Sequence, residues 1–195
     1  FVLGASGAVP VFRFDRWWTV LSAGWLHGSL LHILFNMLWV RQLAPAVAEL
    51  YGPARLVIVY TVASVTGFVL SSLAGQYLNF LPIPQLRGGG LTVGASAAIF
   101  GLLGALVYYG RRSGSSVVHS QALSYALLLG LFGFIMPGID NYAHLGGFAG
   151  GYYVAKYLDP LHPERGDHMA VALGCLAATA AAVLWSTVSG LRMLF

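Results

Sequence analysis

One stretch of the chain decides its fold: GGGLTVGASAAIFGLLGALVYYG, residues 88–110. It contains no Asp, Glu, Lys or Arg, and it exceeds the roughly 20 apolar residues that a helix needs to cross a bilayer. The three glycines at its start indicate a flexible loop, and Thr92 or Gly94 is the expected start of a helix. The stretch therefore predicts a membrane-spanning helix over 93–110.

Five other charge-free windows follow the same pattern. With Asp, Glu, Lys and Arg as breaks, they are 17–40, 56–86, 113–139, 141–155 and 168–191. The window 141–155 continues through Tyr157 and Leu158, because the long Lys156 side chain can reach the interface. Backbone polar groups must be satisfied in lipid, and strand alternation is absent, so we expect an all-α, polytopic membrane helical bundle. Its six transmembrane helices are predicted near 27–48, 54–76, 93–110, 119–136, 141–158 and 169–189.

The composition excludes several classes of protein. Hydrophobic residues make up 58% of the 195 residues and charged residues 8%, against about 25% charged in soluble chains. This excludes a soluble globular enzyme and a disordered tail. It also excludes a nucleic-acid binder, because the basic residues that give the net charge of +4 are scattered along the chain. The single cysteine, Cys175, excludes a disulfide framework and a multi-cysteine metal site. We expect no metal and no cofactor.

The basic residues also predict the orientation of the bundle, because cytoplasmic loops are richer in Lys and Arg. One side carries six of them, and the other side, with the segments 1–26, 77–92 and 137–140, carries four. We assign the richer side to the cytoplasm and the other to the outside. The six are Arg41, Arg55, Arg111, Arg112, Lys156 and Arg165, and the four are Arg13, Arg16, Arg87 and Arg192.

A polar side chain inside a membrane helix is a functional hypothesis by default. His32 and Asn36 lie four residues apart in HGSLLHILFNML, residues 27–38, so they share one helix face and can donate hydrogen bonds to one point. Ser96 lies in the first turns of its helix, where free N–H groups and the helix dipole favour an oxyanion. The structural alternatives are interhelical hydrogen bonds for the first two and close packing for Ser96.

His144 lies in PGIDNYAHLGGFAGG, residues 137–151, about one turn after the expected N-cap Asp140. This places His144 at the depth of Ser96. Gly147 and Gly151 form a GxxxG pattern, typical of close helix contact. The matching small-residue face is Gly94, Ala97, Ala98, Gly101, Gly104 and Ala105. If the two faces touch, His144 can activate Ser96 as a nucleophile; the alternative is a packed, hydrogen-bonding histidine.

The motifs HGSLLHILFNML, GASAAIFG and NYAHLGGFAGG, in this order, resemble the rhomboid intramembrane serine proteases from about Trp17 to Lys156. The resemblance implies that Ser96 is the nucleophile and His144 the general base. It also implies that Asn36 and His32, with the Ser96 backbone N–H, stabilise the oxyanion. Gly94 matches the glycine of the G-x-S turn, and Phe100 matches an aromatic residue that packs on the catalytic histidine.

The expected function is therefore a serine endopeptidase that cleaves single-span transmembrane substrates and uses no cofactor. Its partners would be transmembrane proteins and the lipid bilayer, with no nucleic acid and no metal. The resemblance suggests an integral protein of the bacterial inner membrane whose active site opens outward. The helix at 119–136 and the loop Met136–Ile139 resemble the lateral gate of the family.

The resemblance also predicts the organisation of the chain. Because the family carries its serine on the fourth core helix and its histidine on the sixth, the first core helix is expected before Phe1. Residues 1–26 then correspond to the external first loop, 27–158 to the protease core, and 159–195 to a cytoplasmic linker with an extra transmembrane helix.

Three positions depart from the family pattern. Ala97 replaces a glycine, Thr19 replaces the arginine of a Trp-Arg pair, and Ala48 replaces a glutamate, with Glu49 one place on. None removes a catalytic group, so an active enzyme is predicted. The alternatives are an inert rhomboid-like protein that binds membrane clients, and a small transporter whose pathway is lined by His32, Asn36 and His144.

Overall fold

The computed structural model describes residues 2–193, and its named elements there are all helical, which confirms the all-α prediction. The chain passes through short helical turns before, and between, its long helices. The turns are η1 (Val9–Arg13), α1 (Thr19–Ser22), η2 (Ala23–Trp25) and η3 (Pro84–Leu86). The long helices are α2 (Leu30–Tyr51), α3 (Pro53–Tyr77), α4 (Ser96–Ser113), α5 (Ser116–Ile135), α6 (Asn141–Leu158) and α7 (Gly166–Leu191).

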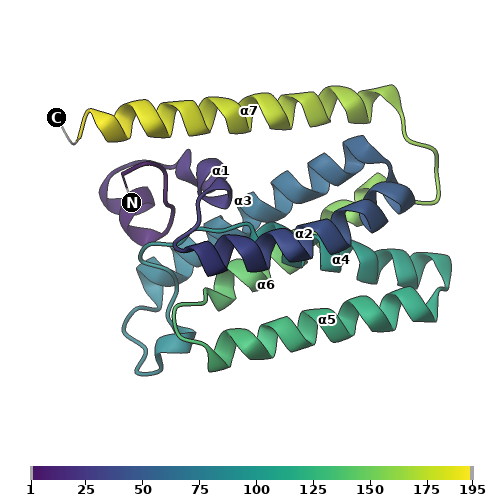
Figure 1. The fold of residues 1–195 in the computed structure, drawn as a ribbon, viewed down its shortest axis with the longest axis horizontal. Coiled ribbons are helices and arrows are strands. Elements are labelled where there is room, and N and C mark those ends of the chain that lie inside the picture. Colours follow the sequence, from purple (N-terminus) through teal and green to yellow (C-terminus); the bar gives the residue numbers. More distant parts are fainter. Residues whose placement is uncertain (1, 194–195) are drawn as a thin grey trace.

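Helix α4 is the centre of the bundle. It packs against α2, α3, α5 and α6, while α5 and α7 run along opposite sides of the molecule (Figure 1). Leu102, Leu103 and Ala105 of α4 are fully buried, and Val47 of α2 packs into the same core. A helix that is apolar on every side belongs in the interior, which is where α4 lies.

Four helices, α2, α3, α5 and α7, are long and apolar enough to cross a membrane. The 18-residue helices α4 and α6 are not among them. Arg111, Arg112 and several glycines and tyrosines lower the hydropathy of these two helices, which are also the ones that meet at the centre. The expected count of six crossing helices stays a prediction.

The helix starts show where local signals are sufficient. Helix α6 has the predicted bounds, and α5 and α7 begin three residues earlier than predicted. The predicted start of α4 near 93 is wrong, because Gly94 has φ +123° and its N–H donates to Ala23 O at 3.0 Å. The predicted start of α2 at 27 is also wrong, because the extended residue Ser29 accepts from His32 N at 3.2 Å and caps a helix that begins at Leu30.

The bundle has two ends, which we name the Ser96 end and the Arg55 end. At the Arg55 end the guanidinium of Arg55, only 1% exposed, donates to His168 Nδ1 at 3.0 Å and to carbonyls of residues 159, 162 and 163. Its backbone N–H donates to Glu164 Oε1 at 2.8 Å. A buried charge is costly without such partners, so Arg55 fixes the linker between α6 and α7 to the start of α3.

Candidate active site

Ser96 is the first residue of α4 and is partly exposed. The chain reaches it through Gly94, whose positive φ turns the backbone sharply into the helix. The first N–H groups of a helix have no partner within the helix and carry the positive end of its dipole. The fold therefore places the Ser96 hydroxyl next to a group of backbone donors.

His144 lies one turn into α6, where the predicted cap is present: Asp140 Oδ1 accepts from Ala143 N at 3.0 Å. The Nε2 atom of His144 is 3.0 Å from Ser96 Oγ, which is hydrogen-bond distance. The Phe100 ring stacks on the imidazole at 4.2 Å between centroids and 16° between planes. His144 is buried, at 9% exposed, and its Nδ1 has no hydrogen-bond partner among the described residues.

The glycines explain how α4 and α6 come this close. A Cβ on Gly147 would lie 2.0 Å from Ala97 O, and one on Gly151 would lie 2.1 Å from Gly101 O. A Cβ on Gly104 would lie 2.3 Å from the carbonyl oxygen of residue 148. Each separation is far below van der Waals contact, so only glycine allows the two backbones to touch here.

Gly101 and Ala97 also serve a second contact, to α3. A Cβ on Gly101 would lie 2.0 Å from the Ala63 Cβ, and one on Gly67 would lie 2.6 Å from the Ala97 Cβ. The methyl group that Ala97 adds to the family pattern is therefore accommodated by a glycine on α3. Helices α3, α4 and α6 meet at this level.

His32 and Asn36 of α2 border the turn that precedes Ser96. Any Cβ on Gly94 would lie 2.6 Å from His32 Nε2 and 3.6 Å from Asn36 Nδ2. One amide hydrogen of the buried Asn36 side chain donates to His32 O at 3.0 Å, which leaves the second hydrogen free of that bond. Gly28 N donates to His32 Nδ1 at 3.3 Å, so the neutral ring carries its proton on Nε2, beside Gly94.

Sequence reasoning missed several residues around this site. His27 stacks edge-on against His32 with 5.0 Å between ring centroids, and burial, then the nearby His32, lowers the pKa of His27. Asn141 Nδ2 donates to Gly133 O of α5 at 3.2 Å, next to the Asp140 cap. Neither His27 nor Asn141 belongs to a periodic sequence pattern. Asn141 could have been noticed because it is a polar residue next to the helix cap Asp140.

Thr19, which stands where the family pattern has an arginine, lies beside another arginine, Arg16. Thr19 is buried and its hydroxyl donates to Arg16 O at 2.7 Å, while Arg16 itself is buried, at 2% exposed. The other departure has no comparable consequence: Ala48 O accepts from Gly52 N at 2.8 Å at the end of α2, and Glu49 is exposed.

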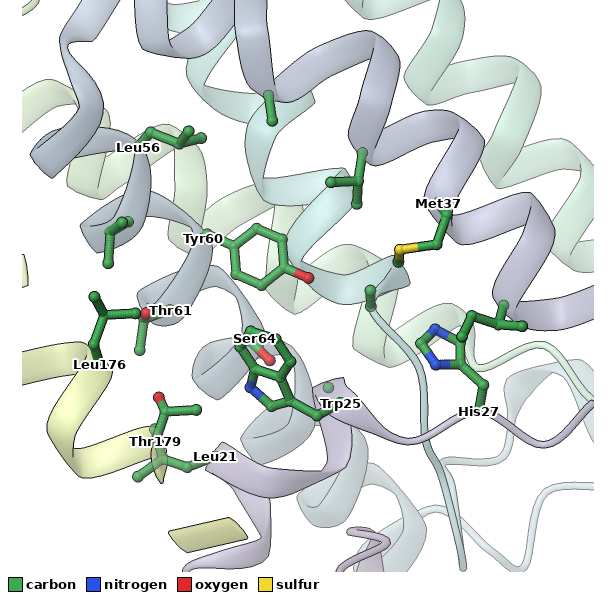
Figure 2. A pocket seen from close by; sticks show the side chains of 16 residues that line it. Leu21, Trp25, His27, Met37, Leu56, Tyr60, Thr61, Ser64, Leu176 and Thr179 are labelled. Carbon is green, nitrogen blue, oxygen red and sulfur yellow. The ribbon is translucent and has the colours of Figure 1, made fainter. Parts of the chain in front are cut away.

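A cavity of about 410 Å³ lies behind the Ser96 turn, between α2, α3, the segment 21–27 and α7. Figure 2 shows Trp25, Tyr60 and Met37 on its walls, and Ala95 also lines it, whereas Ser96 and His144 do not. The lining is mostly apolar. The cavity is therefore separate from the hydrogen-bonded pair.

The chain is similar to known proteins over most of its length. The family model of the rhomboid domain matches residues 15–160. The chain is 33% identical over 164 residues to RHOMBOID-like protein 4 of Arabidopsis thaliana, covering 80% of this chain and 38% of that protein. It is 32% identical over 146 residues to the rhomboid protease GluP of Bacillus subtilis, covering 73% of this chain and 26% of that protein. It is 27% identical over 163 residues to Rhomboid-like protease 3 of Toxoplasma gondii, covering 80% of this chain and 57% of that protein.

The chain thus spans about a quarter to three fifths of the length of these relatives. The family match runs from the N-terminal segment to the start of the α6–α7 linker, and so contains the Ser96 turn, the His144 helix and the His32–Asn36 face together. With its helical bundle and its apolar helices, this chain belongs to the rhomboid family.

Proposed function

We propose that this chain is an intramembrane serine endopeptidase with Ser96 as nucleophile and His144 as general base. The observation that carries the proposal is the 3.0 Å separation of His144 Nε2 and Ser96 Oγ, formed by two residues 48 positions apart. A nucleophile within hydrogen-bond reach of a histidine is the arrangement that activates a hydroxyl. The family includes proteases, such as the relative named rhomboid protease GluP, which supports this assignment.

In the first half of the reaction, Ser96 Oγ attacks the carbonyl carbon of the substrate peptide and gives its proton to His144 Nε2. The tetrahedral intermediate collapses when His144 returns that proton to the leaving amine, and an acyl ester on Ser96 remains. In the second half, water attacks the ester, again with its proton passing to Nε2. Ser96 then recovers its hydroxyl, and the new carboxyl end of the substrate leaves.

The negative oxygen of each tetrahedral intermediate needs donors that are in place beforehand. We assign this role to the free amide hydrogen of Asn36, the Nε2–H of His32 and the backbone N–H of Ser96. The first two border Gly94, two residues before the nucleophile. Gly94 contributes by having no side chain, since a Cβ there would occupy the space beside both donors.

Phe100 holds the imidazole in place. Because His144 Nδ1 has no hydrogen-bond partner among residues 2–193, the stacked Phe100 ring is the contact that sets the plane of the imidazole. The neutral ring accepts the serine proton on Nε2 when its own proton is on Nδ1. A dyad without a third polar residue is thus the form of catalysis that these contacts support.

We infer that the substrate is a single transmembrane helix that reaches the dyad past α5. The face of α5 that carries Leu127, Leu128 and Leu131 is exposed, as a helix bordering lipid requires. At the Ser96 end, a hydrogen bond from Asn141 to Gly133 O joins α6 to α5. When this bond breaks, that end of α5 can move away while the opposite end of the helix stays packed. The whole bundle, with six crossing helices in the bacterial inner membrane and the Ser96 end outward, is part of this proposal.

The test is cleavage of a fluorogenic single-span substrate by the purified protein in lipid nanodiscs, together with labelling of Ser96 by a fluorophosphonate. Ser96→Ala and His144→Ala should each abolish cleavage and labelling without changing the thermal stability. Ser120→Ala, an exposed serine on α5, is the matched control and should stay active. If the Ser96→Ala variant still cleaves the substrate, the assignment of Ser96 as nucleophile is refuted. A wild type that binds the substrate but neither cuts nor labels would instead be a client-binding rhomboid-like protein.

A further inference from the structure

Helix α7 contacts the N-terminal segment, and that segment in turn contacts the backbone in front of Ser96. We propose that α7 is part of the active-site scaffold: it fixes the N-terminal segment, residues 2–26, and that segment fixes the backbone in front of Ser96. The inference rests on the proposed function and goes beyond it, because α7 begins after the family match ends at residue 160. Ser186 and its contacts are then positioning elements and not catalytic residues.

The first link joins α7 to α1. Ser186 is completely buried, and its Oγ is 3.0 Å from Ser22 Oγ. Ser22 Oγ donates to Gly4 O at 2.9 Å, and since a hydroxyl has one hydrogen, Ser186 is the donor to Ser22. The packing is equally close, because a Cβ on Gly4 would lie 2.9 Å from the Ser186 Cβ.

The second link is the buried charge of Arg16. Its Nη2 donates to Ser186 O at 3.3 Å, to Ser189 Oγ at 3.1 Å and to Val2 O at 2.8 Å. The guanidinium also lies 5.8 Å from the centroid of the Trp18 ring. Withdrawal of α7 would remove most of these acceptors from a buried cation, which is costly. Figure 1 shows the N-terminal segment and α1 beneath the C-terminal half of α7.

The third link joins the N-terminal segment to the Ser96 turn at two points. Ser6 and Thr92 exchange two backbone hydrogen bonds, of 3.0 and 2.8 Å, and Gly94 N donates to Ala23 O at 3.0 Å. These contacts hold the chain four and two residues before Ser96. A shift of the N-terminal segment therefore moves the turn at Gly94, and with it the first residue of α4, relative to His144 on α6.

The cavity in Figure 2 closes a direct route from the middle of α7 to α2. Leu176 and Thr179 of α7 lie on one of its walls and Met37 of α2 lies on another, so the cavity separates the middle of α7 from α2. Helix α7 packs chiefly against α3 and α1. The hydrogen-bonded route from α7 to the Ser96 turn runs through the residues that Ser186 and Ser189 contact.

The experiment compares Ser186→Ala with Thr187→Ala, in the nanodisc assay. Thr187 is the neighbouring residue and is exposed, and within residues 2–193 its hydroxyl bonds only to Val183 O of its own helix. Loss of one buried hydrogen bond predicts a kcat about three- to tenfold lower for Ser186→Ala, with an unchanged KM and an equally slower fluorophosphonate reaction at Ser96. Thr187→Ala should match the wild type in all three quantities.

Two further variants separate positioning from general destabilisation. Ser22→Ala should lower kcat at least as much as Ser186→Ala, because it removes the bond to Gly4 O as well as the bond from Ser186. The double variant should be no slower than Ser22→Ala alone, because the bond between the two hydroxyls is already lost in either single variant. Ser186→Leu should lower kcat by about 10²-fold, the loss expected for a displacement near 1 Å, while Thr187→Leu should not. Melting temperatures in the same nanodiscs confirm that each variant is folded at the assay temperature.

A Ser186→Ala variant with a lower melting temperature but an unchanged kcat and labelling rate would show that α7 is only structural and would overturn the inference. In that case the wild type is still active and the proposed function stands. A wild type whose Ser96 is never labelled would instead overturn the proposed function, and the inference with it.

Discussion

Replacement of Gly147 by alanine is the sharpest test of the link between helix packing and catalysis. The added Cβ would lie 2.0 Å from Ala97 O, and Cβ atoms in proteins essentially never approach other heavy atoms closer than 3.0 Å. The neighbouring atom is backbone and cannot rotate away. Helices α4 and α6 must therefore separate locally by about 1 Å, right beside the nucleophile.

The expected cost follows from that displacement. Ser96 directly precedes Ala97, and His144 lies one turn before Gly147, so the separation lengthens the 3.0 Å contact between Nε2 and Oγ. A misplacement of about 1 Å costs roughly 10²-fold in rate. Overpacking by one methyl group also costs about 1–3 kcal/mol of stability. We expect kcat to fall by about 10²-fold and the melting temperature to fall with it.

The assay measures kcat on the fluorogenic substrate and the rate of fluorophosphonate reaction, well below the melting temperature of the variant. Gly130→Ala in α5 and Gly174→Ala in α7 are matched controls, because a Cβ at either position has no neighbour within 4 Å. Both should remain fully active. If Gly147→Ala keeps wild-type kcat, the close contact of α4 and α6 does not set the distance between Ser96 and His144.

Two other substitutions test individual groups in the same assay. Asn36→Ala should lower kcat by about 10²–10³-fold, or 2.7–4 kcal/mol, with little change in KM, because one oxyanion donor is lost; a change confined to KM would show that Asn36 only binds substrate. Ala97→Gly should retain activity, because it removes a methyl group that packs on Gly67 and leaves the contact with Gly147 intact; a loss of activity comparable to that of Gly147→Ala would contradict this packing.

The proximity of Ser96 and His144 could be predicted because its signals are local. Asp140 as a helix cap sets the start of α6, and the glycines at 147 and 151 mark the face that meets α4. Depth and facing side together bring the two residues near each other. The catalytic roles of Ser96 and His144 stay proposals, because a short distance between two side chains is not a measurement of activity.

The start of α4 and the burial of Arg16 could not be predicted, because both depend on residues far away in the chain. Thr92 and Gly94 read as a helix start until Ser6 is seen to hold Thr92 in a β-bridge and Ala23 O to accept from the N–H of Gly94, whose φ is positive. Arg16 reads as a surface arginine until the carbonyl of Ser186 is placed beside it. Contacts of this kind have no period and no motif.

The hydrogen bond between Ser22 and Ser186 joins residues 164 positions apart, so it cannot form until the ribosome has synthesised the chain between them. At a synthesis rate of about 5–20 residues per second, α7 emerges about 10–30 s after α1. During that interval Ser22 lacks its bond from Ser186, and the Arg16 guanidinium lacks its two acceptors on α7, so this charge must stay in contact with water. The Ser96 end of the bundle is thus completed last, after the ribosome has added residue 190.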